Sequence, residues 1–224
     1  KLLPTAREVI RQAYGKLPDR SYYGGCSNGG RHALVAAARY AADYDGFLAG
    51  APGFNLPRAA VANIYGAQRY ITVAASAGEY TAANLGTAFT AAERQLLSNA
   101  VAAKCDALDG ATDGIVQDTG ACQARFSLQT DVPTCSGERD GSCLTAAQKA
   151  VVGDIFAGPK TSSGATVYAS FPFDTGHATA GVANWEFNAP VALDSGAVGL
   201  IFKVPPLAGS SSPAQLATWA MTTS

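Results

Sequence analysis

A serine flanked by glycines stands near the start of this 224-residue sequence, in the segment Gly25-Cys26-Ser27-Asn28-Gly29. The pattern G-x-S-x-G is typical of a nucleophile on a sharp turn between a strand and a helix, where side chains two positions to either side would collide. The Ser27 hydroxyl would act as a nucleophile, and the backbone N–H of Asn28 would stabilise the oxyanion that forms when it attacks a carbonyl group. A glycine-rich turn in which Ser27 caps a helix accounts for the same residues.

The elements that such a turn requires are predicted on both sides of it. The first 54 residues predict a helix over 5–14, a strand over 20–24, a helix over 31–42 and a strand over 46–49. This alternation is typical of a parallel α/β sheet, with Ser27 between the first strand and the second helix. Because two strands do not make a stable sheet alone, we expect the chain to be a piece of a larger protein.

Capping-box pairs predict where three helices begin. The pairs are Thr5 with Glu8, Thr90 with Glu93, and Thr145 with Gln148. They predict helices over 5–14, 91–103 and 145–156, and residues 59–72 are also compatible with a helix. From residue 158 onward the apolar periodicity is weak, and no element is predicted there.

An acidic segment, CDALDGATDGIVQD, covers residues 105–118. A curled loop could direct the carboxylates of Asp106, Asp109 and Asp113 to one centre, and Gly110 and Gly114 permit tight turns. Hard oxygen ligands without nearby histidine suit Ca²⁺. A solvated acidic turn fits equally well, and the residues alone leave both interpretations open.

Five cysteines favour disulfides over a zinc or redox site, since the sequence contains only two histidines and no C-x-x-C pair. The cysteines are Cys26, Cys105, Cys122, Cys135 and Cys143. Disulfides indicate an oxidising compartment, whereas free buried thiols are the alternative. Five is an odd number, so one cysteine is free, pairs with another chain, or pairs with a part of the protein outside this sequence.

The composition excludes several classes of protein. Sixteen Lys and Arg against 17 Asp and Glu give a net charge of −1, without the basic excess of a nucleic-acid-binding protein. Hydrophobic residues make up 48% of the chain, enough for a core, yet no apolar window is long enough for a membrane span. The N-terminal segment KLLPTAREVIRQ lacks the apolar stretch of a signal peptide.

The stretch around Ser27 resembles the tannase and feruloyl esterase family, and the resemblance continues to about Cys143. It rests on Gly25-Cys26-Ser27-Asn28-Gly29-Gly30-Arg31, Tyr44-Asp45-Gly46 and Ala49-Gly50-Ala51-Pro52-Gly53. That family is an α/β hydrolase with a large inserted lid. The resemblance implies that residues 1–54 are part of the catalytic core and that residues 55–224 are lid.

The resemblance also implies that the catalytic machinery is incomplete in this chain. In the family, the cysteine before the nucleophile is disulfide-bonded to a cysteine directly after the catalytic histidine. Cys26 matches the first half of that pattern, whereas neither His32 nor His177 precedes a cysteine. We interpret His32 as a packing or surface residue and His177 as a lid residue. The remainder of the protein, beyond Ser224, is expected to supply the catalytic Asp and His, and a loop before Lys1 the second oxyanion donor.

The family's lid carries a structural calcium in a D-x-x-D-x-x-x-D loop stapled by a disulfide. The resemblance implies that the calcium ligands in this sequence are Asp106, Asp109, the Ala111 carbonyl, Asp113 and the Ile115 carbonyl. The implied disulfides are Cys105–Cys122 and Cys135–Cys143, and the partner of Cys26 is missing.

The resemblance implies a secreted or periplasmic serine carboxylesterase for small aromatic acid esters, with no nucleic-acid or membrane partner. Trp185 is the candidate wall of the substrate pocket, because aromatic rings stack on such side chains. No arginine follows Arg139, which favours phenolic esters over a terephthalate monoester, whose free carboxylate would suit a guanidinium. We expect this chain alone to be inactive. The alternative is a non-catalytic binding domain of hydrolase fold, stabilised by calcium and disulfides.

Overall fold

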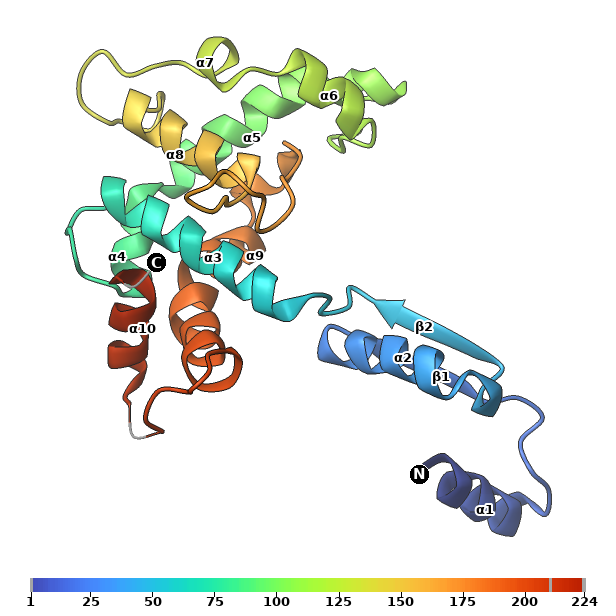
Figure 1. The fold of residues 1–224 in the computed structure, drawn as a ribbon. Helices are drawn as coiled ribbons and strands as arrows, with labels where there is room; N and C mark the ends of the chain where they lie inside the picture. The colour runs from blue at the N-terminus through green and yellow to red at the C-terminus, as the bar shows by residue number, and fades with distance from the viewer. Residues whose placement is uncertain (1, 210, 223–224) are drawn as a thin grey trace. The chain divides into compact units, whose positions relative to one another are not determined.

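The structure, a computed structural model, describes residues 2–209 and 211–222. The chain divides into two compact units, Lys1–Leu56 (unit 1) and Pro57–Ser224 (unit 2). Figure 1 shows two strands only in the N-terminal part of the ribbon, and mostly helices in the remainder. The two units are described separately below.

Unit 1 contains a small parallel sheet covered by a helix. Its elements are α1 (Leu2–Tyr14), β1 (Tyr22–Cys26), α2 (Asn28–Arg39), η1 (Ala41–Asp43) and β2 (Gly46–Gly50). The two strands pair in parallel, with Tyr22 opposite Gly46 and Cys26 opposite Gly50. The chain crosses from β1 to β2 through α2, as a parallel pair requires. The predicted partial α/β-hydrolase core is confirmed in its strand–helix–strand order.

Helix α2 lies close to the sheet because its inward face carries very small residues. Gly30, Ala33 and Ala36 are buried, and they are the only buried residues of this helix. A Cβ atom at Gly30 would lie 2.5 Å from the carbonyl oxygen of Gly50 on β2. The short side chains therefore set how closely the helix approaches the strands.

The predicted capping box at Thr5 is wrong. Helix α1 begins at Leu2, so Thr5 lies inside it, and the Glu8 carboxylate accepts hydrogen bonds from Arg11 and Gln12 instead. Pro4 is tolerated in a first helical turn, where its missing N–H would have no partner, and the helix can therefore start earlier. The predicted end of this helix at Gly15 is confirmed, with a φ of 74°.

The second helix is also displaced from its prediction. It spans Asn28–Arg39 rather than residues 31–42, and a short 3₁₀ turn follows over Ala41–Asp43. The helix starts earlier because it begins directly after the sharp turn at Ser27.

Unit 2 is helical throughout most of its length. Its elements are α3 (Leu56–Tyr70), η2 (Ile71–Val73), α4 (Ala82–Leu85), η3 (Gly86–Ala88), α5 (Ala91–Cys105), η4 (Asp106–Asp109), α6 (Thr119–Arg125), α7 (Leu128–Asp131), α8 (Ala146–Ala157), η5 (Thr175–Ala178), α9 (Ala180–Ala183), the π-helical η6 (Asn184–Asn188), η7 (Pro190–Asp194) and η8 (Ala197–Phe202), and α10 (Pro213–Thr222). The predicted capping boxes of α5 and α8 are both formed. The helix that residues 59–72 suggested is α3.

Helix α10 was not expected from the sequence. Ser212 and Gln215 exchange hydrogen bonds between side chain and backbone, as in a capping box, and Pro213 occupies the first helical position. The sequence Ser-Pro-Ala-Gln carries this signal in a region where the apolar periodicity is weak.

The main hydrophobic core belongs to unit 2, where α5 and α8 contribute many of its side chains. Core members from these helices and their neighbours include Leu85, Leu97, Val101, Val132, Leu144, Val151, Val152, Ile155 and Phe187. Two charged side chains are also buried there. The Glu93 carboxylate, which is fully buried, pairs with the Arg139 guanidinium at 2.6 Å. Lys149 Nζ donates to the carbonyls of Gln129 and Val132 and to Thr134 Oγ1.

Both predicted disulfides are present in unit 2, Cys105–Cys122 and Cys135–Cys143. Cys26 is free and exposed in unit 1. Within residues 2–209 and 211–222, none of the helices has the length and apolar character needed to span a bilayer.

Candidate active site

Ser27 occupies a strained position at the tip of the turn between β1 and α2. Its backbone has φ 57° and ψ −118°, a region that residues other than glycine rarely adopt. Three backbone hydrogen bonds hold this conformation. The Ser27 N–H donates to the Gly50 carbonyl at 3.0 Å, and the Ser27 carbonyl accepts hydrogen bonds from the N–H groups of Arg31 and Gly53. The turn is thus fixed to the end of β2, to α2 and to the segment that follows β2.

The Ser27 hydroxyl makes no capping hydrogen bond to α2 and is exposed. The interpretation of this segment as an ordinary turn that Ser27 caps is therefore wrong. A serine held in an unfavourable backbone conformation, with its hydroxyl unused by the helix, has the features expected of a nucleophile on a sharp turn.

The glycines of the turn have different roles. A Cβ at Gly25 would lie 2.5 Å from the backbone carbon of Gly29, so the predicted collision is confirmed at Gly25. It is wrong at Gly29, where an added Cβ would meet no atom within 4 Å. Gly29 contributes the backbone that Gly25 approaches. The residue that sequence reasoning missed is Gly30, whose Cβ would meet both Gly50 and Pro52.

Asn28 is the first residue of α2, directly after the turn. The first backbone N–H groups of a helix have no acceptor within that helix, and they lie at the positive end of its dipole. The Asn28 N–H therefore has the electrostatic character that a developing oxyanion requires.

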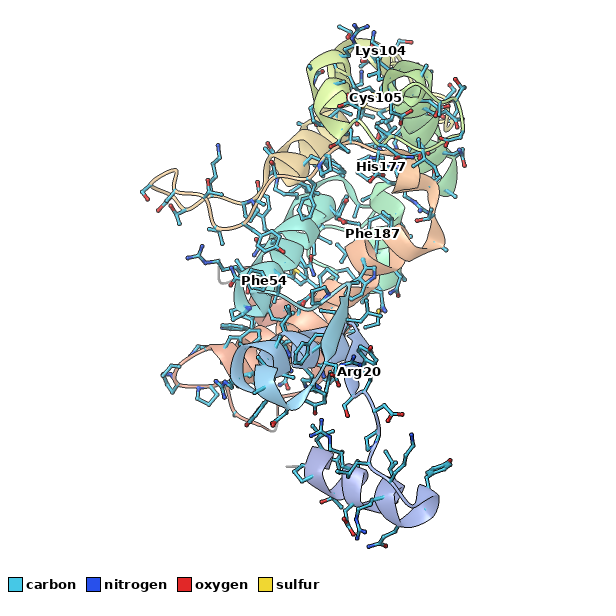
Figure 2. All side chains as sticks on the ribbon, turned by 90° about the vertical axis from the view of Figure 1, so that its right-hand side faces the viewer. Arg20, Phe54, Lys104, Cys105, His177 and Phe187 are labelled. Atoms are coloured by element: carbon cyan, nitrogen blue, oxygen red, sulfur yellow. A yellow bond between two sulfur atoms is a disulfide. The ribbon has the colours of Figure 1, made fainter. Side chains whose placement is uncertain are left out.

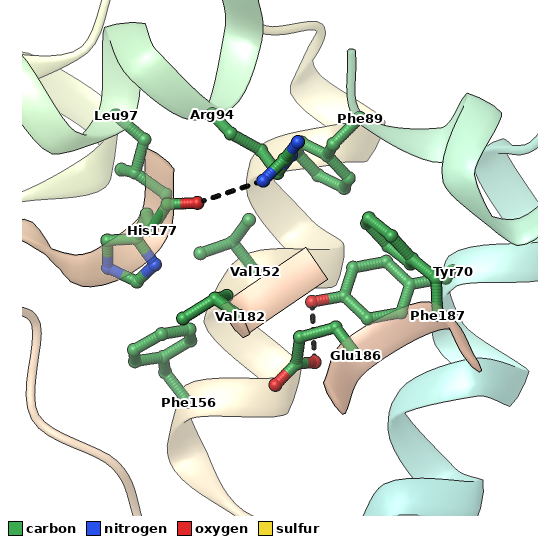
Figure 3. Close-up of a pocket in the computed structure, with 10 residues that line it drawn as sticks. All are labelled: Tyr70, Phe89, Arg94, Leu97, Val152, Phe156, His177, Val182, Glu186 and Phe187. Carbon is green, nitrogen blue, oxygen red and sulfur yellow. Dashed lines mark hydrogen bonds between the residues drawn. The ribbon is translucent and has the colours of Figure 1, made fainter. Parts of the chain in front are cut away.

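The two histidines belong to different units. His32 lies on α2, exposed, in a cavity of unit 1 that Tyr23, Tyr40 and residues of α1 also line. His177 lies on η5 in unit 2, in a small pocket (Figure 3), where it is 8% exposed and its ring centroid is 5.0 Å from that of Phe156. Trp185 lies on η6 and is 57% exposed. Its role as a pocket wall stays a prediction.

The acidic loop, which begins at Cys105 (labelled in Figure 2), is curled as predicted. Its carboxylates accept hydrogen bonds from backbone N–H groups of the same loop. Asp106 Oδ1 accepts hydrogen bonds from the backbone N–H groups of Asp113 and Gly114. The Asp109 carboxylate accepts hydrogen bonds from the backbone N–H groups of Ala111 and Gln117. The amides of Gln117 and Ala111 lower the pKa of Asp109.

The predicted calcium ligands stay a prediction. The loop has the hard oxygen atoms that calcium prefers. Among residues 2–209 and 211–222, however, no three acidic, histidine or cysteine side chains lie together as a metal site requires. The turns at Gly110 and Gly114 are formed as predicted, with φ of 93° and 82°.

Comparison with known proteins connects this arrangement to one family. Residues 1–198 match the family model described as tannase and feruloyl esterase. The chain is 34% identical over 177 residues to a mono(2-hydroxyethyl) terephthalate hydrolase from Piscinibacter sakaiensis, covering 76% of this chain and 29% of the relative. It is 32% identical over 167 residues to a probable feruloyl esterase B-1 from Neosartorya fischeri, covering 70% of this chain and 30% of the relative.

Solved structures agree on the fold. Feruloyl esterase B from Aspergillus oryzae superposes with a TM-score of 0.67 at 24% identity, covering 97% of this chain and 43% of that one. An esterase from the same organism gives a TM-score of 0.68, also at 24% identity, covering 96% of this chain and 40% of that one. The chain thus spans less than half the length of the proteins it matches. With the family model matched over most of its length, this chain belongs to the tannase and feruloyl esterase family.

Proposed function

We propose that this chain is part of a serine carboxylesterase that hydrolyses esters of aromatic acids, with Ser27 as the nucleophile. The observation that carries the proposal is the Ser27 backbone, with φ 57° and ψ −118°, held at the turn between β1 and α2 by backbone hydrogen bonds with Gly50, Arg31 and Gly53. Such strain persists only where surrounding structure enforces it, and it is concentrated at functional sites.

In the proposed reaction, Ser27 Oγ attacks the ester carbonyl and its proton passes to a general base. The Asn28 N–H stabilises the oxyanion of the tetrahedral intermediate. Collapse of that intermediate expels the alcohol and leaves an acyl group on Ser27, which water then releases as the acid. The base and the acid that orients it come from parts of the protein outside this chain, so we expect the isolated chain to lack activity.

The substrate class rests on two kinds of support. The relatives are named for esters of aromatic acids, feruloyl and terephthalate. No arginine follows Arg139 in this sequence, and a free terephthalate carboxylate would favour one nearby. We therefore place phenolic esters first and test both classes with methyl ferulate and mono(2-hydroxyethyl) terephthalate on the complete protein.

We also propose a structural calcium at Asp106, Asp109 and Asp113, with the carbonyls of Ala111 and Ile115, and a secreted or periplasmic location. The location is supported by the two disulfides, which persist in oxidising compartments. For the calcium, isothermal titration of chelator-treated chain is expected to show one binding site that Asp109→Asn weakens. An unchanged melting temperature after exhaustive chelation, with no binding heat, would remove calcium from the proposal.

The nucleophile is tested by labelling the complete protein with a fluorophosphonate, which reacts with activated serines. Wild type and the control Ser212→Ala are expected to be labelled, and Ser27→Ala is not. Peptide mapping that places the label elsewhere would overturn the assignment. Absence of labelling together with retained binding of aromatic ligands would support a non-catalytic binding domain instead.

A further inference from the structure

The segment that follows β2 in unit 1 lies against the turn that carries Ser27, and its sequence is Ala51-Pro52-Gly53. Among residues 2–209 and 211–222, the residues other than glycine with a positive φ are Ser27, Ala51 and Asn55, at 57°, 37° and 50°. Such conformations cost free energy and persist only where neighbouring structure enforces them. Ser27 and Ala51 each follow directly after the last residue of their strand, so the strain lies at the same register on both strands.

The parallel hydrogen-bond ladder continues one step beyond the paired residues and then changes. The Ser27 N–H donates to the Gly50 carbonyl at 3.0 Å, as a regular ladder requires. The next regular bond would run to the Ser27 carbonyl from the N–H of residue 52. That residue is Pro52, which has no N–H. The Ser27 carbonyl accepts instead from the N–H of Gly53, one residue later, at 3.2 Å.

The left-handed conformation of Ala51 accompanies this displacement of the donor by one residue. An extra residue that bends one strand and shifts its pairing is the property of a β-bulge, and bulges beside active sites aim side chains. The same segment packs on α2, since a Cβ atom at Gly30 would lie 3.0 Å from Pro52 Cα. The bulged segment is therefore held between the end of the sheet and the start of the helix.

We propose that Gly53 is a positioning residue for the nucleophile, because its N–H fixes the Ser27 carbonyl and with it the direction of the Ser27 hydroxyl. This inference rests on the proposed function, in which Ser27 attacks the ester. The Gly50 carbonyl restrains Ser27 on its N–H side, and the Gly53 N–H restrains it on its carbonyl side. Pro52 acts by withholding the donor that would continue a regular ladder, in which Ser27 would be extended.

The Gly53 hydrogen bond contributes more to direction than to stability. The Ser27 carbonyl also accepts from the N–H of Arg31 at 3.0 Å, as the residue before a helix does. Ser27 is exposed, so water can replace a lost donor at little net cost. Without the Gly53 N–H, the carbonyl would remain bonded to α2 but would no longer be tied to the segment after β2. We therefore expect the reactivity of Ser27 to fall while the fold is retained.

The test is the rate at which a fluorophosphonate labels the complete protein. Gly53→Pro removes the N–H and is expected to slow labelling about tenfold or more. Gly53→Ala is the conservative variant: it keeps the N–H, φ at this position lies outside the left-handed region, and the added Cβ would meet only the flexible Leu56 side chain, at 3.1 Å. It should be labelled at close to the wild-type rate. With methyl ferulate, Gly53→Pro should lower kcat and leave KM within about twofold of wild type.

Pro52→Ala tests the same mechanism without adding a proline. It restores an N–H at the regular ladder position, where it competes with Gly53 for the Ser27 carbonyl. We expect labelling to slow by about threefold and amide exchange at Gly53 to accelerate. The matched control is Pro18→Ala, at a half-buried proline of unit 1, which should be labelled at the wild-type rate. The two proline variants should have similar melting temperatures.

Wild-type labelling rates in both Gly53→Pro and Pro52→Ala would overturn the proposal. Equal slowing by Gly53→Ala and Gly53→Pro would overturn it as well, because the N–H would then not be the group that acts. If Gly53→Pro does not fold, Pro52→Ala and the Gly53 amide decide: an amide that exchanges in the wild-type chain as fast as an unbonded one contradicts the proposal. Labelling that persists in Ser27→Ala, measured in the same series, would refute the proposed function itself.

Discussion

The two units differ in how much of their apolar surface they bury. Unit 2 encloses a continuous core, with Leu85, Val101 and Leu144 fully buried. In unit 1, helix α1 has no buried residue, and Tyr22 and Leu48 on the two strands are 71% and 73% exposed. The strained serine therefore lies in the unit with the smaller core. We infer that unit 2 accounts for most of the chain's own stability, whereas the geometry at Ser27 depends on a few close backbone contacts.

The largest effect is expected from Lys149 in unit 2. Lys149→Met removes an ammonium group that donates to Gln129, Val132 and Thr134, and it leaves those oxygens without this donor. We expect a loss of about 3 kcal/mol in the free energy of unfolding, measured by urea denaturation of the chain. The control is Lys104→Met, since Lys104 is 44% exposed in its pair with Asp131 and is expected to contribute under about 1 kcal/mol.

Equal losses from these two lysine variants would show that buried donors do not determine the stability of unit 2. Hydrogen exchange should place the loss in unit 2, with faster exchange in α7 and α8 and little change in β1 and β2. Faster exchange over the whole chain would break the comparison, because the two units would then unfold together.

In unit 1, the expected effect is somewhat smaller and depends on which glycine is changed. Gly30→Ala places a Cβ 2.5 Å from the Gly50 carbonyl oxygen, so α2 must move away from β2, and we expect a loss of about 2 kcal/mol. Gly29→Ala is the matched control on the same helix, with no atom within 4 Å of the new Cβ. It should be neutral or stabilise the chain by up to about 1 kcal/mol.

The measurement for this pair is hydrogen exchange in β1, β2 and α2, with fluorophosphonate labelling of the complete protein as the functional readout. We expect Gly30→Ala to accelerate exchange there and to reduce labelling of Ser27. If Gly29→Ala had the larger effect, the close approach of α2 to the sheet would not be what fixes the turn.

The features that could be predicted from the sequence are those that depend on local geometry. The order of elements around Ser27 was predictable because G-x-S-x-G, flanked by a strand and a helix, depends on local backbone geometry. The helix starts at Thr90 and Thr145 were predictable for the same reason, since a capping box is made within four residues. Both disulfides of unit 2 followed from the resemblance to a family rather than from spacing.

The features that escaped prediction depend on contacts distant in the sequence. The role of Gly30 is visible only when Gly50 and Pro52 are placed beside it, and a small residue in an alanine-rich helix gives no such signal. The pocket around His177 is likewise assembled from segments between residues 70 and 187. Helix α10 is the exception, because its Ser-Pro-Ala-Gln start is a local signal made within four residues.

The smallest expected effect is a pH dependence confined to unit 2. Burial lowers the pKa of His177 from its ordinary value, so the unfolded chain binds a proton at a higher pH than the folded chain does. Stability should therefore decrease as the pH falls below about 6.5, with a slope of at most about 1.4 kcal/mol per pH unit, until the folded-state pKa is reached. Burial raises the pKa of Glu186, which acts in the opposite sense: its contribution is present at low pH and is lost as the pH rises through the folded-state value.

The His177 contribution is isolated by comparing the urea midpoint between pH 7.5 and 5.5 for wild type and two variants. His177→Phe should reduce the slope, because the aromatic packing is retained and the titrating group is gone. His32→Gln, in unit 1, should leave it unchanged. A slope that disappears with His32→Gln and persists with His177→Phe would place the sensitive group in unit 1. It would also reverse the inference that the acid response of this chain arises from burial in the larger core.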